Sequence, residues 1–133
     1  MLLGHQQTSQ TVTFKVESGK WDDDTTADKL VPLKGYEGDE LKLAKDDIPA
    51  AGLKPDENYK AGGWVETPNT DTPITADTIY TYKYVGKEDI IRTVTFKVVD
   101  GKWDDDSTAD KTVTLSGKEG VTLKLAEKQI PVV

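Results

Sequence analysis

Cysteine is absent from this chain of 133 residues, and histidine and methionine occur once each. The chain therefore has no disulfide, no zinc–thiolate or iron–sulfur site and no cysteine nucleophile. The single histidine, His5, lies in a polar N-terminal stretch that offers no partners for a Ser-His-Asp triad or a multi-histidine metal site. We expect His5 to be a tail residue, and we expect neighbouring repeats to stabilise the fold in place of disulfides.

Long apolar runs are also missing. Hydrophobic residues make up 35% of the chain, and no run approaches the ~20 residues of a membrane span. Residues 1–10 are too short and too polar for a signal peptide. The formal net charge of −7 argues against binding to nucleic acid or to anionic membranes, which need clustered Lys and Arg. We therefore expect no nucleic-acid partner and no membrane insertion.

The chain does contain most of itself twice. Residues 11–50 align with residues 93–132 without a gap, at an offset of 82, and 27 of the 40 positions are identical. Tandem copies of this kind are typical of repeat proteins. The second copy stops at Val133, about halfway through the unit, so we expect a segment of a longer protein.

These boundaries predict four parts of the chain. They are an N-terminal tail (1–10), a complete repeat unit (11–85), a linker (86–92) and a truncated second repeat that holds only the first half of a unit (93–133).

Period-two alternation predicts a mainly β fold, a β-rich α+β class with little helix. Val12, Phe14 and Val16 share one face of a strand, and residues 94–98 repeat the pattern. Residues 29–33 predict a second strand, which Pro32 places at a sheet edge because proline cannot donate to a ladder. Residues 78–85 predict the clearest strand, residues 53–63 a loop, and residues 44–49 one helical turn before proline.

Three segments resemble known bacterial surface repeats. The YKAGGW segment at residues 59–64 is similar to a G-Y-x-x-x-G-W motif, and residues 73–82 (PITADTIYTY) resemble a closing P-[IV]-T-x-D-x-T-x-Y strand. Val12-Thr13-Phe14 matches the V-T-F that opens such units. These motifs belong to the Listeria–Bacteroides repeats and the internalin B-repeat.

The resemblance implies a small β-grasp-like module, present in tandem in secreted or wall-attached proteins of Gram-positive bacteria. It implies a structural role, as a spacer or as a module that presents an adhesive tip. The expected location is extracellular, at the cell surface or cell wall. No catalytic residue carries over, so we expect no enzyme activity.

Acidic loops are the first candidate site. Calcium takes six to eight oxygen ligands, and clustered carboxylates suit it. The candidate ligands are Asp22, Asp23, Asp24 and Asp28, with Asp104, Asp105, Asp106 and Asp110 in the second copy. The spacing is not that of an EF-hand loop, so the alternative is a solvated turn whose Asp and Thr side chains bond nearby backbone N–H groups. We expect no other cofactor.

Aromatic residues are the second candidate site. A platform of exposed rings would stack on sugars and make the module a ligand-binding adhesin that recognises a glycan or a host protein. The alternative is that the rings fill a small core and the hydroxyls reach its rim. The residues concerned are Trp21, Trp64, Trp103, Tyr80, Tyr82 and Tyr84.

The half copy leaves its pairing open. The chain has two similar N-terminal halves, 11–50 and 93–132, and one C-terminal half, 51–85, which could pair with either. The remaining half would expose strand edges, which favour augmentation or domain swapping. The expected partners are therefore neighbouring repeats of the same protein and an edge-strand or domain-swapped dimer.

Overall fold

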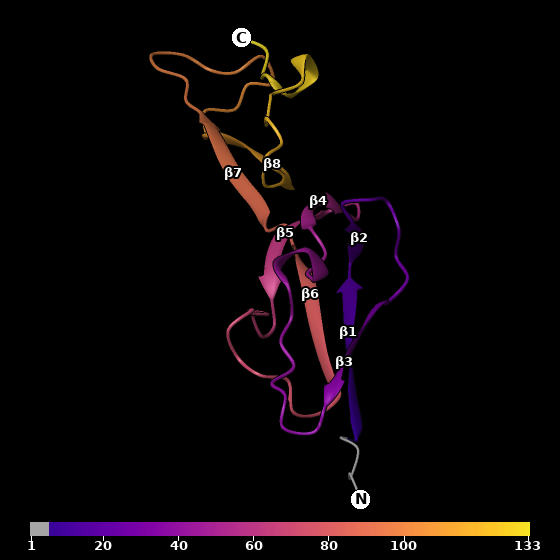
Figure 1. Cartoon of the computed structure of the whole chain (residues 1–133). Helices are drawn as coiled ribbons and strands as arrows, with labels where there is room; N and C mark the ends of the chain where they lie inside the picture. The colour runs from indigo at the N-terminus through magenta and orange to yellow at the C-terminus, as the bar shows by residue number, and fades with distance from the viewer. Residues whose placement is uncertain (1–5) are drawn as a thin grey trace, which may run out of the picture. The chain divides into compact units, whose positions relative to one another are not determined.

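The computed structural model describes residues 6–133, which form two compact units (Figure 1). Unit 1 ends at Gly86, and unit 2 begins at Lys87. β-Strands are the main regular secondary structure of both units, so the predicted mainly β class is confirmed. The only helical segments among the described residues are two single turns of 3-10 helix.

Unit 1 contains six strands and one 3-10 turn. The strands are β1 (Gln7–Glu17), β2 (Gly19–Trp21), β3 (Lys29–Tyr36), β4 (Ala51–Pro55), β5 (Tyr59–Trp64) and β6 (Thr78–Gly86), and the turn is η1 (Lys45–Asp47). The turn precedes Pro49, as the sequence predicts.

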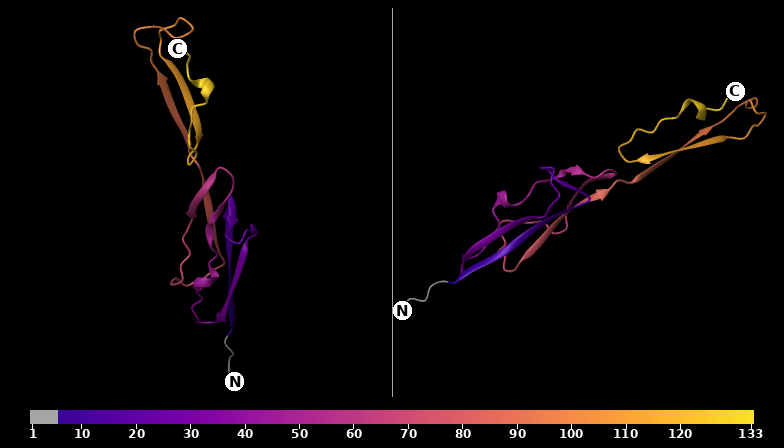
Figure 2. Two further views of the ribbon diagram at one scale, coloured as in Figure 1. Left: turned by 90° about the horizontal axis from the view of Figure 1, so that it is seen from above. Right: turned by 90° about the vertical axis from the view of Figure 1, so that its right-hand side faces the viewer.

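Four of these strands form the main sheet, in the order β3-β1-β6-β5. β1 pairs antiparallel with β3 and parallel with β6, so the first and last strands of the unit lie side by side at its centre (Figure 2). β3 lies at the sheet edge, which confirms the prediction from Pro32. β2 and β4 form a separate antiparallel pair.

The core of unit 1 combines residues from both halves of the repeat. Val12 and Phe14 of β1 are fully buried. The other core residues are Trp21, Leu33, Leu43, Ile74, Tyr80, Tyr82 and Tyr84. Each fully buried large side chain contributes about 1.5–3 kcal/mol relative to exposure, so this cluster supplies much of the unit's stability.

Unit 2 repeats the first half of this architecture. β7 (Asp89–Phe96) pairs antiparallel with β8 (Lys111–Lys118), and η2 (Glu127–Gln129) follows. The register is that of β1 and β3 shifted by 82 residues, because Val94 faces Val113 as Val12 faces Val31. After β8, the last segment (yellow in Figure 2) runs back along the hairpin.

The C-terminal half of the repeat pairs with the first copy. β6 lies beside β1, at a register that joins Phe14 to Tyr80 and Val16 to Tyr82. Of the two pairings that the sequence leaves open, the structure therefore has the sequential one.

Three sequence expectations need correction. Residues 7–10 of the predicted tail belong to β1, and residues 89–92 of the predicted linker belong to β7. Most of the predicted loop at residues 53–63 belongs to β4 and β5, joined by a turn in which Asn58 has a positive φ of 68°. These stretches are largely polar or glycine-rich, or lack strict alternation. Pairing with a neighbouring strand makes them strands, and their own side-chain pattern does not reveal it. His5, the expected tail residue, lies outside the described residues.

Candidate functional site

The acidic loop of unit 1 is closed by its own backbone. The Trp21 N–H donates to the Thr25 carbonyl oxygen at 2.9 Å, and the Asp24 N–H donates to the Trp21 carbonyl oxygen at 2.9 Å. Asp24 has a positive φ of 71°, a conformation that Asp tolerates better than most residues. Short polar residues therefore form a tight turn directly after the buried Trp21.

Asp23 is the best-connected carboxylate of this loop. It accepts hydrogen bonds from the Thr25 N–H at 3.0 Å and the Thr25 hydroxyl at 2.5 Å, and it pairs with the Lys29 ammonium at 2.5 Å. The Lys29 hydrogen bond, followed by those from Thr25, holds the pKa of Asp23 well below its usual range. Asp23 thus stays ionised and joins the loop to the start of β3.

The second copy builds the same loop. Asp105 accepts hydrogen bonds from the Ser107 N–H and hydroxyl and pairs with Lys111 at 2.6 Å. The Lys111 hydrogen bond lowers the pKa of Asp105, and the Ser107 bonds add to the effect. Asp106 has a positive φ of 67°, as Asp24 does. Both copies form the same loop, although only unit 1 contains the C-terminal half of the repeat. The loop geometry therefore depends on residues 21–29 and on their copies, residues 103–111.

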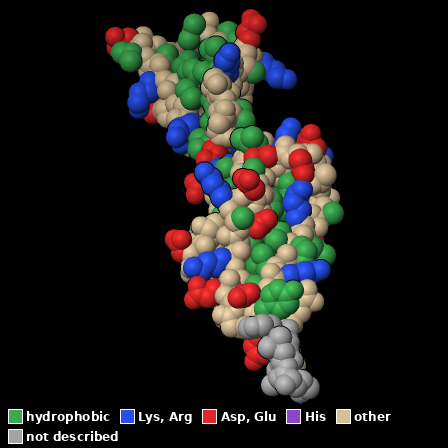
Figure 3. All heavy atoms as spheres, viewed as in Figure 1, with side chains coloured by type: hydrophobic (Ala, Val, Ile, Leu, Met, Phe, Trp, Pro, Cys, Tyr) green, Lys and Arg blue, Asp and Glu red, His purple; other side chains and the backbone are tan. Residues whose placement is uncertain are grey.

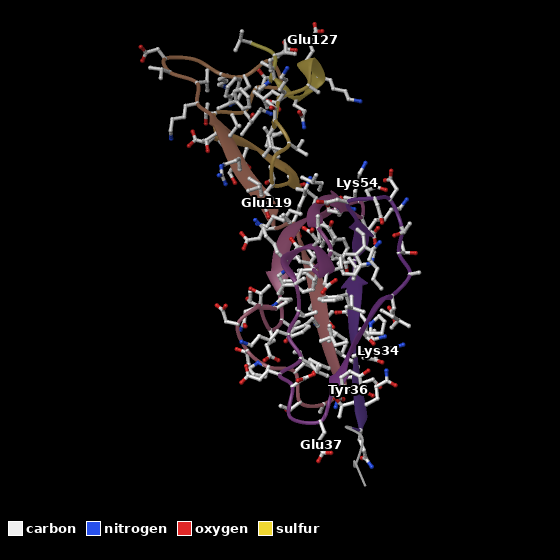
Figure 4. All side chains as sticks on the ribbon, in the orientation of Figure 1. Lys34, Tyr36, Glu37, Lys54, Glu119 and Glu127 are labelled. Atoms are coloured by element: carbon white, nitrogen blue, oxygen red, sulfur yellow. The ribbon has the colours of Figure 1, made fainter. Side chains whose placement is uncertain are left out.

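The remaining calcium candidates of unit 1 turn to different partners. Asp28 pairs with Lys15 at 2.6 Å, Asp24 pairs with Lys54 (labelled in Figure 4) at 3.3 Å, and the Asp22 carboxylate accepts the Leu53 N–H at 3.0 Å. In unit 2, Asp110 pairs with Lys97 at 2.6 Å. Within residues 6–133, no three acidic or histidine side chains lie close enough together to hold a metal ion. Each of the four carboxylates of the unit 1 loop is engaged in a hydrogen bond or an ion pair.

A shallow open hollow lies beside each acidic loop. In unit 1 it runs between Trp21, the acidic loop and the 3-10 turn, and the residues 82 positions later line the hollow of unit 2. It recurs because the loop and the 3-10 turn are held together in the same way, by Asp22 N–H to Ala50 carbonyl (3.1 Å) and Asp104 N–H to Val132 carbonyl (3.0 Å).

The candidate aromatic platform is a core cluster. Trp21, Tyr80, Tyr82 and Tyr84 are buried, and Trp64 is half-buried against them. Edge-to-face and stacked contacts join the rings, with centroids 5.0–6.1 Å apart. In unit 2, Trp103 is buried on its own half unit, and its indole N–H donates to the Ala109 carbonyl at 2.8 Å, as Trp21 donates to Ala27. Five of these six rings are therefore buried, and Trp64 alone among them is partly exposed, so the six do not form an exposed platform.

Two tyrosine hydroxyls hold the unit together. The Tyr84 hydroxyl accepts the N–H groups of Gly52 and Lys54 at 2.9 and 3.1 Å and donates to the Lys20 carbonyl at 2.6 Å. The Tyr82 hydroxyl accepts the Gly62 N–H at 3.1 Å. The last strand thereby fastens β2, β4 and β5, a role that the period-two tyrosines indicate only in part.

Gly19 is a second residue whose importance the sequence does not reveal directly. A Cβ at this position would collide with the Tyr84 ring and would lie 2.6 Å from the Lys54 carbonyl oxygen. The signal was the recurrence of glycine at positions 19 and 101, directly before each Lys-Trp pair.

Comparisons with family models, curated proteins and solved structures give no match for this chain. Among residues 6–133, no helix is long and apolar enough to cross a membrane.

Proposed function

We propose that this chain is a structural spacer module of a bacterial surface adhesin-like protein, without catalytic activity. Its fold is β-grasp-like, its neighbours are repeats of the same protein, and its location is extracellular, on the wall of a Gram-positive cell. The identical register of β1–β3 and β7–β8 supports a modular role, because one folding unit is used twice within the chain.

The observation that carries the proposal is the parallel pairing of β1 with β6, from Val12↔Thr78 to Glu17↔Lys83. Strand β1 enters unit 1 and strand β6 leaves it. Because the two are parallel, the entry and the exit lie at opposite ends of the pair. Tension along the chain therefore loads all the hydrogen bonds between these strands at once, in shear.

Shear resistance suits a spacer that bears load between a cell and a surface. Breaking several slanted parallel bonds together requires more force than breaking them one after another. The side-chain pair Lys83–Glu17, at 3.5 Å, lies at the last position of the same strand pair.

The buried aromatic residues favour the spacer over the rival function, a ligand-binding adhesin domain. Recognition of a glycan or a host protein by stacking needs exposed rings. Trp21 is 1% exposed and Tyr84 is 4% exposed. These rings serve packing and backbone hydrogen bonds.

Force spectroscopy tests this function. The chain has no cysteine, so two introduced cysteines give unique handles. The pair Gln6→Cys and Gly86→Cys loads β1 and β6 in shear, whereas Glu17→Cys and Gly86→Cys peels them apart from one end. We expect a rupture force several-fold higher for the first pair. Equal, low forces for both pairs would argue against a load-bearing role.

A further inference from the structure

Unit 2 exposes, on its half copy, the face that is covered in unit 1. Val12 and Phe14 are 0% exposed, but their copies Val94 and Phe96 are only half-buried. Leu33 and Leu43 are buried, whereas Leu115 and Leu125 are half-buried. Figure 3 shows hydrophobic side chains gathered on the visible face of unit 2.

The free edge of β7 also distinguishes unit 2 from unit 1. β1 pairs with β3 on one side and β6 on the other. Among the described residues, β7 belongs to a two-stranded sheet and pairs with β8 alone. The second edge of β7 therefore presents backbone donors and acceptors at the positions that β6 occupies beside β1.

The glycine pair adds an independent observation. Gly19 is buried and leaves no room for a Cβ, because the Tyr84 ring lies against it. Gly101, its copy, is exposed, and a Cβ there would meet nothing within 4 Å. Unit 2 therefore leaves space for a tyrosine ring beside Gly101, and its own residues do not fill this space.

The half unit already has the loop and turn geometry of unit 1. The Trp103 indole hydrogen bond, the Lys97–Asp110 and Lys111–Asp105 ion pairs and the η2 turn reproduce their counterparts in unit 1. Binding therefore need not create the loop and the turn. The cost of ordering falls mainly on the incoming segment.

We propose that unit 2 is a receptor for one further copy of the segment Ala51–Gly86, which adds a parallel strand to the free edge of β7 and covers Val94 and Phe96. The register follows from unit 1: Val94 pairs with the added copy of Thr78, and Phe96 with the added copy of Tyr80. The added copy of Tyr84 lies against Gly101. The segment within this chain already occupies unit 1, so the occupant is an additional copy.

The first test titrates the isotope-labelled full chain with a peptide of residues 51–86. We expect saturable 1:1 binding and slowed amide exchange along β7. Phe96→Ser abolishes binding. The matched control Ile91→Ser leaves it unchanged, because Ile91 is 60% exposed, stands where unit 1 has the exposed Ser9, and corresponds to a position outside the register that pairs β1 with β6.

A lengthened chain keeps the proposal testable when the peptide alone is poorly soluble. Val133 occupies the position of Ala51, so a copy of residues 52–86 is added directly after it. We expect the β7 amides to gain the protection of the β1 amides, and Gly101→Ala to lower the melting temperature only in the lengthened chain. Replacing the added copies of Tyr80, Tyr82 and Tyr84 by serine removes both effects.

Protection of the β7 amides that point away from β8, in either format, supports the proposal. The proposal is overturned if these amides stay unprotected in the lengthened chain, or if Gly101→Ala has an equal effect in both chains. A concentration-dependent dimer that pairs two β7 edges and excludes the peptide also overturns it, because the occupant is then a second copy of unit 2. None of these outcomes depends on mechanical strength. Force spectroscopy therefore tests the proposed spacer function independently of this proposal.

Discussion

The hydroxyl of Tyr84 donates a hydrogen bond to the carbonyl oxygen of Lys20 at 2.6 Å, across 64 residues of sequence. The Tyr84 hydroxyl oxygen also accepts hydrogen bonds from two backbone N–H groups of β4, those of Gly52 and Lys54. One atom of the last strand therefore holds β2 and β4, the small second sheet of unit 1. This sheet depends on Tyr84 as well as on its own ladder.

Removing that hydroxyl should destabilise unit 1. Tyr84→Phe keeps the ring but leaves two N–H groups and a carbonyl without their partner, in a partly buried place. We expect a loss of about 1–3 kcal/mol in the free energy of unfolding. Urea denaturation followed by tryptophan fluorescence measures it. Tyr59→Phe, at a residue that is 37% exposed, is the control, and equal stability of the two variants would contradict the role of Tyr84.

The glycine pair gives a matched comparison within one chain. Gly19→Ala forces a methyl group against the Tyr84 ring and the Lys54 carbonyl, and overpacking of this kind costs about 1–3 kcal/mol. Gly101→Ala places the methyl group in open space and should leave stability almost unchanged. Thermal unfolding of both variants checks this. A Gly101→Ala penalty as large as that of Gly19→Ala in the unlengthened chain would show that something already covers Gly101.

Acid should weaken the loop around Asp23. Its pKa is lowered in the folded state, chiefly by the Lys29 hydrogen bond and then by Thr25. A lowered folded pKa means that the stabilisation is present above the unfolded value of about 3.9 and is lost as pH falls toward the folded value. Carboxyl NMR measures the titration directly.

Lys29→Met should move the pKa of Asp23 back up toward its ordinary value, and Lys34→Met should leave it in place. Asp105 in the unaltered second copy is an internal control, because Lys111 and Ser107 lower its pKa in the same way. An ordinary pKa for Asp23 in the native chain would mean that the Lys29 pair does not persist in solution.

Iodide quenching distinguishes tryptophans that are buried in a core from tryptophans that form an exposed ligand-binding platform. Trp21 is 1% exposed, Trp103 is 6% exposed and Trp64 is half-buried. We expect weak quenching overall, and Trp64→Phe should remove most of the quenchable signal. Strong quenching that survives Trp64→Phe would indicate exposed Trp21 or Trp103 and would favour the adhesin function.

The strands that sequence analysis found are those whose own side chains alternate. In β1 and β6, apolar or aromatic residues stand at every second position, as Val12, Phe14 and the tyrosines of β6 do. The pattern arises because these side chains face the core. Pro32 marked its strand as an edge for a local reason, the missing N–H. Such features are visible without any knowledge of the partner strand.

The missed elements depend on residues far away in the sequence. β4 is short and β5 is rich in glycine, and both are fastened by hydroxyls of β6, at Gly52, Lys54 and Gly62. The two candidate sites also differ in whether their structure follows from the local sequence. The hydrogen-bonded turn at Asp23 follows from local Asp and Thr chemistry, whereas the burial of the tyrosine faces depends on how the two halves of the repeat meet.

The most direct test of the account compares amide hydrogen exchange in β1 and β7 of one sample. The two strands share the sequence TVTFKV and differ in their neighbours, because β1 has a strand on both sides over Val12–Phe14, whereas β7 has β8 alone. We expect continuous protection over Val12–Phe14 and protection of alternate residues over Val94–Phe96, since only every second residue of β7 bonds to β8. Continuous protection along β7 would contradict an open second unit, and no protection in β7 would contradict the repeated hairpin itself.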